Sequence, residues 1–144
     1  MHEELKVEIN ASVERIWESL VDIENWPVFT TSISSVRRID QGPFGLGSCA
    51  RVKQPGTGTL MWSVTKFAPG QFFVWEAKRP GLTLVAGHFL ALGDNGRVKL
   101  TLTLEAKGLL SRLLRRSIEK STTKNLRLEA EGHKTCAELP ESGL

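Results

Sequence analysis

One titratable side chain, His88, lies in the middle of an alternating segment whose other members on the same face are leucine or alanine. An imidazole can donate or accept a proton near neutral pH. His88 is therefore a candidate general acid or base, or a hydrogen-bond donor to a ligand oxygen. The alternative is a buried histidine satisfied by a neighbouring carbonyl or one at a cavity rim with no task, and the sequence leaves these interpretations open.

The spacings that other chemistries need are missing. The histidines, His2, His88 and His133, are far apart, and no cysteine–histidine cluster has ligand spacing, so we expect neither a metal nor another cofactor. No G-x-S-x-G nucleophile elbow occurs, and the chain has no tyrosine to hold an oxyanion. The two cysteines, Cys49 and Cys136, are predicted to be reduced thiols.

Bulky and polar side chains occur where a pocket would use them. Trp62 and Trp75 lie on predicted strands, where they either stack on a flat ligand or pack in the core. Thr122 and Asn125, in the last predicted helix, either offer polar contacts to a ligand or face solvent. Residues 121–123 interrupt the leucine pattern of that helix, which favours a loosely packed stretch.

Basic residues gather in the same helical segment. Residues 112–127 contain six arginines and lysines and a single acid, Glu119, which gives a local charge of +5. This cluster indicates weak contact with an anionic membrane surface or an acidic partner, or else an ordinary solvated helix face. Nucleic acid is not an expected partner, because no aromatic residues alternate with the cations.

The size and composition of the chain favour one globular domain. It has 144 residues, of which 40% are hydrophobic and 24% charged. We expect the domain to cover residues 1–138 and a flexible tail to cover 139–144. No apolar run approaches the roughly 20 residues of a membrane-spanning helix, and no signal pattern opens the chain, so a cytoplasmic location is expected.

Most of the chain has the alternation of β-strands. A strand is predicted at 3–9, and further strands at 36–40, 48–54, 58–67, 71–78, 82–92 and 98–106. Short turns rich in glycine, proline and asparagine join the later strands, which predicts an antiparallel meander. Alternate residues from Leu82 to Leu92, and from Leu100 to Leu104, should share one dry face.

Two helical regions flank these strands. Ser12 is a good N-cap for a first helix that should end before Pro27, and residues 29–35 form a second helical turn or a loop. After Gly108, one proline-free helix is predicted over 110–136. Its stripe of mostly apolar residues, four apart, comprises Leu110, Leu114, Ile118, Thr122, Leu126 and Ala130.

The predicted order is one strand, one or two short helices, six strands and a long helix, which is an α+β architecture. A straight helix across a curved antiparallel sheet contacts it at both ends and leaves an apolar cavity beneath its middle. The residues expected to line that cavity are Trp62, Val64, Phe73, Trp75, Ala86, His88, Leu90, Leu102, Leu114, Ile118, Thr122 and Asn125.

Short motifs in a fixed order span nearly the whole chain: Ala11-Ser12-Val13-Glu14-Arg15-Ile16-Trp17, Trp26-Pro27, Trp62-Ser63-Val64-Thr65, Phe73-Val74-Trp75 and His88-Phe89-Leu90-Ala91-Leu92. On these the chain resembles the START/Bet v 1-like (SRPBCC) superfamily, in particular its small bacterial polyketide cyclase/dehydrase-like and lipid-transport-like members. The resemblance implies the helix-grip (Bet v 1-like) fold. It does not imply one reaction, because the superfamily includes lipid carriers, cyclases and hormone receptors.

We therefore expect a protein that binds a small hydrophobic, aromatic or lipid-like molecule between the sheet and the last helix. The alternative is a cyclase/dehydratase-like enzyme that uses the same cavity, with His88 moving protons. Whether the protein is an enzyme is left open, as is the choice between a monomer and a homodimer.

Overall fold

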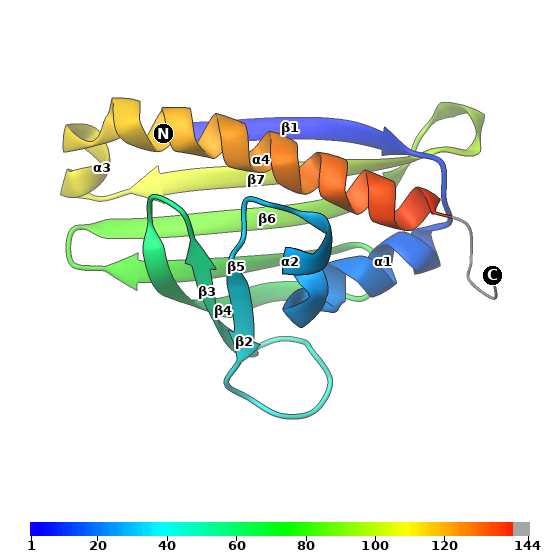
Figure 1. The fold of residues 1–144 in the computed structure, drawn as a ribbon, viewed down its shortest axis with the longest axis horizontal. Helices are drawn as coiled ribbons and strands as arrows, with labels where there is room; N and C mark the ends of the chain where they lie inside the picture. The colour runs from blue at the N-terminus through cyan, green and yellow to red at the C-terminus, as the bar shows by residue number, and fades with distance from the viewer. Residues whose placement is uncertain (140–144) are drawn as a thin grey trace.

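A seven-stranded antiparallel sheet forms the frame of the molecule (Figure 1). The computed structural model describes residues 1–139, so the predicted tail lies outside the described residues except for Leu139. The strand order is β1-β7-β6-β5-β4-β3-β2, which confirms the meander and adds β1 against β7. The strands are β1 His2–Ile9, β2 Ser35–Arg38, β3 Cys49–Gln54, β4 Gly58–Ala68, β5 Phe72–Arg79, β6 Leu82–Leu92 and β7 Val98–Lys107.

One face of this sheet is dry, as the alternation predicts. Phe73, Leu100 and Leu102 have at most 1% of their surface exposed, and alternation along β5 also buries Trp75. Leu92 departs from the expectation, since 80% of its surface is exposed. It is the last residue of β6, where the β6–β7 hairpin projects past the helices, so no helix covers it (Figure 1).

The first helical region is split into three short pieces. These are α1 Val13–Val21, a 3-10 turn at Ile23–Asn25 and α2 Trp26–Phe29. Ser12 caps α1 as predicted, since its Oγ accepts a hydrogen bond from the Arg15 backbone N–H at 3.2 Å. The first helix ends before Pro27, as predicted, but Pro27 is not what ends it. α1 ends at Val21, and Pro27 lies in the first turn of α2, where its missing N–H has no intrahelical partner to lose.

The last helical region is also interrupted. It consists of α3 Leu109–Leu113 and α4 Arg115–Glu138, with a break at Leu114. The predicted single helix is wrong at this point because α3 is held by the β5–β6 turn. The Leu110 N–H donates to the Gly81 carbonyl at 2.9 Å, and Gly108 approaches that carbonyl so closely, at φ +102°, that a Cβ would overlap it.

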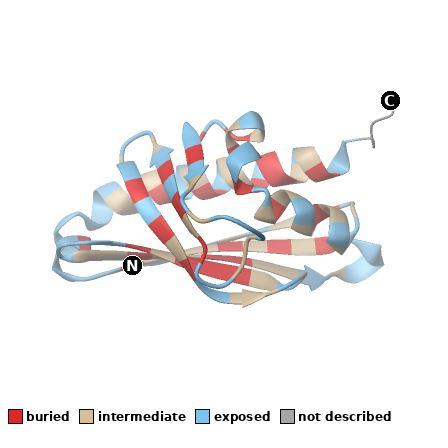
Figure 2. Ribbon diagram, turned by 90° about the horizontal axis from the view of Figure 1, so that it is seen from below, coloured by how far each residue is buried: buried red, intermediate tan, exposed pale blue. Residues whose placement is uncertain are grey.

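The C-terminal half of α4 is fastened to the rest of the fold. Arg15 Nε donates to the Ala137 carbonyl at 2.6 Å, and Lys134 Nζ donates to the Glu8 carbonyl at 2.8 Å. Gly132 lies so close to α2 that an added Cβ would come within 2.5 Å of the Phe29 carbonyl oxygen. Buried residues therefore mark this half of α4, whereas exposed residues mark α3 and the first turns of α4 (Figure 2).

Two further properties bear on the expectations from sequence. Cys49 and Cys136 are both free thiols. Within residues 1–139, no helix has the length and apolarity needed to span a membrane.

Candidate functional site

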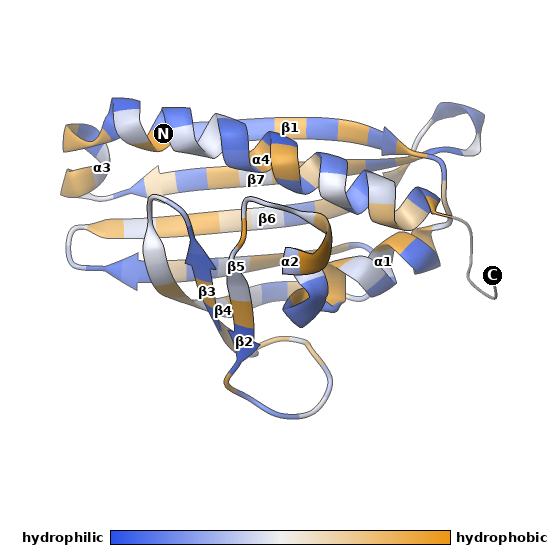
Figure 3. Cartoon of the chain, viewed as in Figure 1, coloured by the Kyte–Doolittle hydropathy of each residue, from blue (hydrophilic) through white to orange (hydrophobic). Residues whose placement is uncertain are grey.

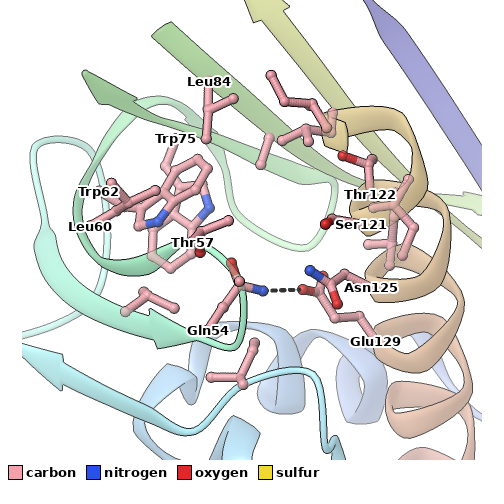
Figure 4. A pocket seen from close by; sticks show the side chains of 18 of the residues that line it. Gln54, Thr57, Leu60, Trp62, Trp75, Leu84, Ser121, Thr122, Asn125 and Glu129 are labelled. Carbon is pink, nitrogen blue, oxygen red and sulfur yellow. Dashed lines mark hydrogen bonds between the residues drawn. The ribbon is translucent and has the colours of Figure 1, made fainter. Parts of the chain in front are cut away.

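A cavity of about 270 Å³ lies between the sheet and the N-terminal half of α4 (Figure 4). Its floor comes from β4, β5, β6 and β7 and includes Trp62, Trp75 and Leu84. Its roof comes from α4 and includes Ile118 and Thr122. The volume is close to the lower end of the range of about 300–1,000 Å³ that small-molecule sites occupy.

Nine of the twelve residues expected from the sequence line this cavity, while Val64, Phe73 and Leu90 do not. The nine are Trp62, Trp75, Ala86, His88, Leu102, Leu114, Ile118, Thr122 and Asn125.

The three other residues lie towards the end of the sheet that α1, α2 and the loop before β3 cover. Phe73 is fully buried, and its ring centroid lies 6.4 Å from that of Trp26 and 5.1 Å from that of Phe44. Val64 is bonded through its backbone to the loop before β3, and Leu90 to the β4–β5 turn. The alternation of residues along a strand predicts which face of the sheet a side chain lies on. It does not distinguish the filled end of that face from the hollow end.

A polar strip along α4 is the main feature that sequence reasoning missed. Ser117, Ser121, Asn125 and Glu129 are four residues apart and all line the cavity, yet the sequence pointed only to Asn125. The sequence did carry a signal for them, which is their four-residue spacing. Each one precedes a member of the apolar stripe by one position, so the four lie along one side of that stripe on the helix. The cavity therefore has an apolar floor and one polar edge.

Glu129 is the ionisable group at the inner end of this strip. Its Oε1 accepts a hydrogen bond from Gln54 Nε2, the two atoms being 3.4 Å apart (Figure 4). Removal from water raises the pKa of Glu129 to about 7, and the Gln54 hydrogen bond opposes that rise only in part. Glu129 therefore takes up and releases a proton closer to neutral pH than an ordinary glutamate does.

The β3–β4 turn supplies a further polar group. Thr57 lines the cavity, and its hydroxyl oxygen is buried without a hydrogen-bond partner among the described residues. A buried hydroxyl left unpaired costs free energy, which a bound polar group would recover. Gln54, Thr57 and Glu129 thus gather at one side of the cavity (Figure 4).

His88 has the environment of a buried histidine satisfied by a carbonyl. It is 3% exposed, its Nδ1 lies 3.4 Å from the Phe73 carbonyl oxygen, and its ring stacks on that of Phe73 at 4.1 Å. Burial lowers the pKa of His88 to about 4, while the Phe73 carbonyl opposes the change. His88 is therefore neutral at pH 7 and a weak base, although it also lines the cavity.

A second buried histidine, His133, lies outside the cavity lining. Its Nδ1 is 3.5 Å from Ser19 Oγ, and its ring meets that of Trp26 edge-on at 5.6 Å. Burial and the nearby His88 lower the pKa of His133 to about 3. Within residues 1–139, no three side chains of histidine, cysteine, aspartate or glutamate are close enough together to hold a metal ion.

The exposed members of the lining show where the cavity opens. Four of the lining residues are exposed: Gly56, Arg79, Leu114 and Ser117. They come from the β3–β4 turn, the end of β5 and the α3–α4 junction. The mouth is therefore bordered by these three segments, and the break in the last helical region lies at its edge.

Comparison with known proteins gives the following similarities. The sequence profile of the family described as "polyketide cyclase/dehydrase and lipid transport" matches residues 2–135. No sequence among the curated proteins matches the chain.

Solved structures share the fold at low sequence identity. A hypothetical protein from Helicobacter pylori has a TM-score of 0.80 and 14% identity, covering 95% of this chain and 86% of that one. The Zhui aromatase/cyclase from a Streptomyces species has a TM-score of 0.79 and 16% identity, covering 96% and 93%. A START superfamily protein from Mycobacterium smegmatis has a TM-score of 0.73 and 16% identity, covering 93% and 97%.

Proposed function

This chain belongs to the polyketide cyclase/dehydrase and lipid-transport family, and we propose that it binds a small, largely apolar molecule with one polar edge in the cavity beneath α4. The observation that carries the proposal is the cavity itself. Protein interiors are close-packed, so an unfilled space of this size with a polar strip on one side favours a ligand site over imperfect packing.

The walls indicate the shape of that molecule. Trp62 and Trp75 have ring centroids 5.5 Å apart at an interplanar angle of 31°, which offers a floor for a flat ring. Asn125, Glu129 and Thr57 offer hydrogen bonds along one side. Burying about 300 Å² of apolar ligand surface at roughly 25 cal/mol/Å² contributes about 7–8 kcal/mol before the costs of association. Micromolar binding needs a net free energy of about 8 kcal/mol, so hydrogen bonds along the polar side must add to the apolar contribution.

A fluorescent naphthylamine probe tests this proposal. Titration should give saturable 1:1 binding, with enhanced probe emission and quenching of tryptophan. Ala86→Phe places a ring in the cavity and should weaken binding at least tenfold. The matched control is Ala91→Phe, on an exposed position of the same strand, which should bind as the native protein does. Absence of saturable binding, or equal binding by both variants, would reject the cavity as the site.

A cyclase/dehydratase-like reaction is the second candidate, and Glu129 is the observation that favours it. Loss of water from a β-hydroxy ketone takes a proton from the carbon beside the carbonyl and returns one to the departing hydroxyl. A carboxyl group whose pKa is about 7 suits either step at neutral pH. His88, whose pKa is about 4, suits neither as well.

Single-site variants distinguish the two candidate acids. With a β-hydroxy ketone as substrate, Glu129→Gln should abolish turnover while the naphthylamine probe still binds. Turnover that survives in Glu129→Gln but is lost in His88→Ala would return the catalytic role to His88. No turnover by the native protein on such substrates would leave binding as the function.

A further inference from the structure

Four leucines beside the mouth of the cavity are exposed, although the stripe they continue is buried further along α4. The exposed fractions are 70% for Leu109, 37% for Leu110, 72% for Leu113 and 48% for Leu114. Leu110 and Leu114 belong to the predicted apolar stripe and yet are exposed, although Leu114 also lines the cavity as expected. Single exposed leucines are ordinary, but four within six residues form a patch.

The break at Leu114 explains why these leucines face solvent. Because α3 is tied to the β5–β6 turn through Gly81 and Gly108, it ends before α4 begins its course over the sheet. Leu110 therefore lies against the β5–β6 turn at Gly81, whereas most of the surface of Leu109 and Leu113 stays exposed. Figure 3 shows α3 as a mostly apolar segment at the end of the molecule that also carries the β5–β6 turn.

Positive charge surrounds the leucines. Arg112, Arg115 and Arg116 are exposed, and Lys120 follows one turn later. Glu119 is the one acid in residues 112–127, and its carboxylate is paired with Arg115 Nε at 2.7 Å. The segment thus presents apolar side chains together with more cations than Glu119 can neutralise, an arrangement that complements an interface of apolar chains beneath anionic headgroups.

We propose that residues 109–120 dock the protein on an anionic lipid membrane, with the leucines of α3 inserted among the headgroups and the arginines against the phosphates. Leu114 is both exposed and part of the cavity lining, so docking places the mouth of the cavity at the lipid surface. An apolar ligand would then pass between membrane and cavity without crossing water. That last consequence rests on the proposed function, whereas docking itself does not.

Co-sedimentation with vesicles tests the docking. The native protein should bind vesicles of phosphatidylglycerol and phosphatidylcholine and should not bind phosphatidylcholine alone. Binding should weaken as salt rises from 50 to 500 mM, because the attraction is screened. The double variant Leu109→Ser with Leu113→Ser should bind at least tenfold more weakly. Arg112→Glu and Arg116→Glu should each weaken binding about fivefold or more.

Matched controls lie away from the mouth. Leu92→Ser removes an equally exposed leucine from the end of β6, and Lys66→Glu reverses an exposed charge on β4. Neither should change binding to vesicles.

Three results would overturn the docking proposal: equal binding to neutral and anionic vesicles, no loss in the variants of residues 109–120, or equal loss in the controls. A concentration-dependent dimer that Leu113→Ser dissociates would assign the patch to a second copy of the chain instead. The naphthylamine titration on the same variants separates the two proposals. Vesicle binding lost with probe binding retained supports docking by this patch, and vesicle binding without any probe binding would reject only the cavity.

Discussion

The two halves of α4 belong to one continuous helix and differ in what lies beneath them. The C-terminal half buries Ala130, Gly132, His133 and Ala137 and is bonded to β1 and α1. The residues from 115 to 125 bury only Thr122 and cover the cavity. One half therefore completes the core while the other covers a hollow, so the free energy of local opening should be lower over the cavity.

The largest expected effect is the loss of stability at low pH that comes from His133, in the C-terminal half of α4. Burial lowers the pKa of His133 to about 3 from the ordinary value of 6.5, so the unfolded chain takes up a proton first as pH falls. Its contribution to stability is complete above pH 6.5 and is lost progressively below it, by about 3 kcal/mol between pH 7 and pH 4. His88 acts in the same direction.

Urea unfolding of His133→Phe at pH 7 and pH 4 measures this contribution. Between pH 7 and pH 4, the free energy of unfolding should fall by about 3 kcal/mol less in the variant than in the native protein. His2→Gln, at an exposed position of β1, should keep the native dependence. An unchanged pH dependence in His133→Phe would contradict a neutral, buried His133.

Substitution by alanine should destabilise the protein in the fastened half of α4 and have little effect over the cavity. In an exposed helix, replacing glycine by alanine stabilises by about 1 kcal/mol. At Gly132 the new Cβ meets the Phe29 carbonyl oxygen at 2.5 Å, so Gly132→Ala should instead destabilise by about 2 kcal/mol. Ser121→Ala, over the cavity, should change the unfolding free energy by less than about 0.5 kcal/mol. A stabilising Gly132→Ala would show that the contact with α2 is loose.

Glu129 lies where the two halves meet, and its effect should be the smallest of the three. The pKa of Glu129 in the folded state is raised to about 7, so ionising this carboxyl lowers the free energy of unfolding. The penalty is absent below pH 4.5, where the carboxyl is protonated in both states, and complete above pH 7. Glu129→Gln should therefore match the native protein at pH 4.5 and exceed its stability by about 1–2 kcal/mol at pH 8. Equal stability of the two proteins at both pH values would mean that Glu129 is hydrated.

The fold was largely predictable because strand alternation is a local property. Face parity in β4, β5 and β7 identified Trp62, Trp75 and Leu102 as inward-facing. The same parity also selected Phe73, which the rings of α1, α2 and the loop before β3 cover. Parity defines a face of the sheet, whereas the filled and hollow ends of that face depend on segments distant in sequence.

The polar strip and the helix break were harder to predict for different reasons. Ser121 and Glu129 on a helix have the same local pattern as a solvated face, and only the sheet opposite makes them part of a cavity wall. Leu114 is a strong helix former with no proline nearby. The break depends on the contact between Gly81 and Gly108, which are 27 positions apart in the sequence.

The sheet remains open, with β1 at one border and β2 at the other, and each border has its own protection against growth by a further strand. β2 has four residues, two of them arginines, which is too short and too charged to template a neighbour. β1 is longer, but Glu4, Lys6 and Glu8 alternate along its exposed side. A protein that carries exposed leucines at its cavity mouth thus disfavours fibrous assembly through its backbone edges.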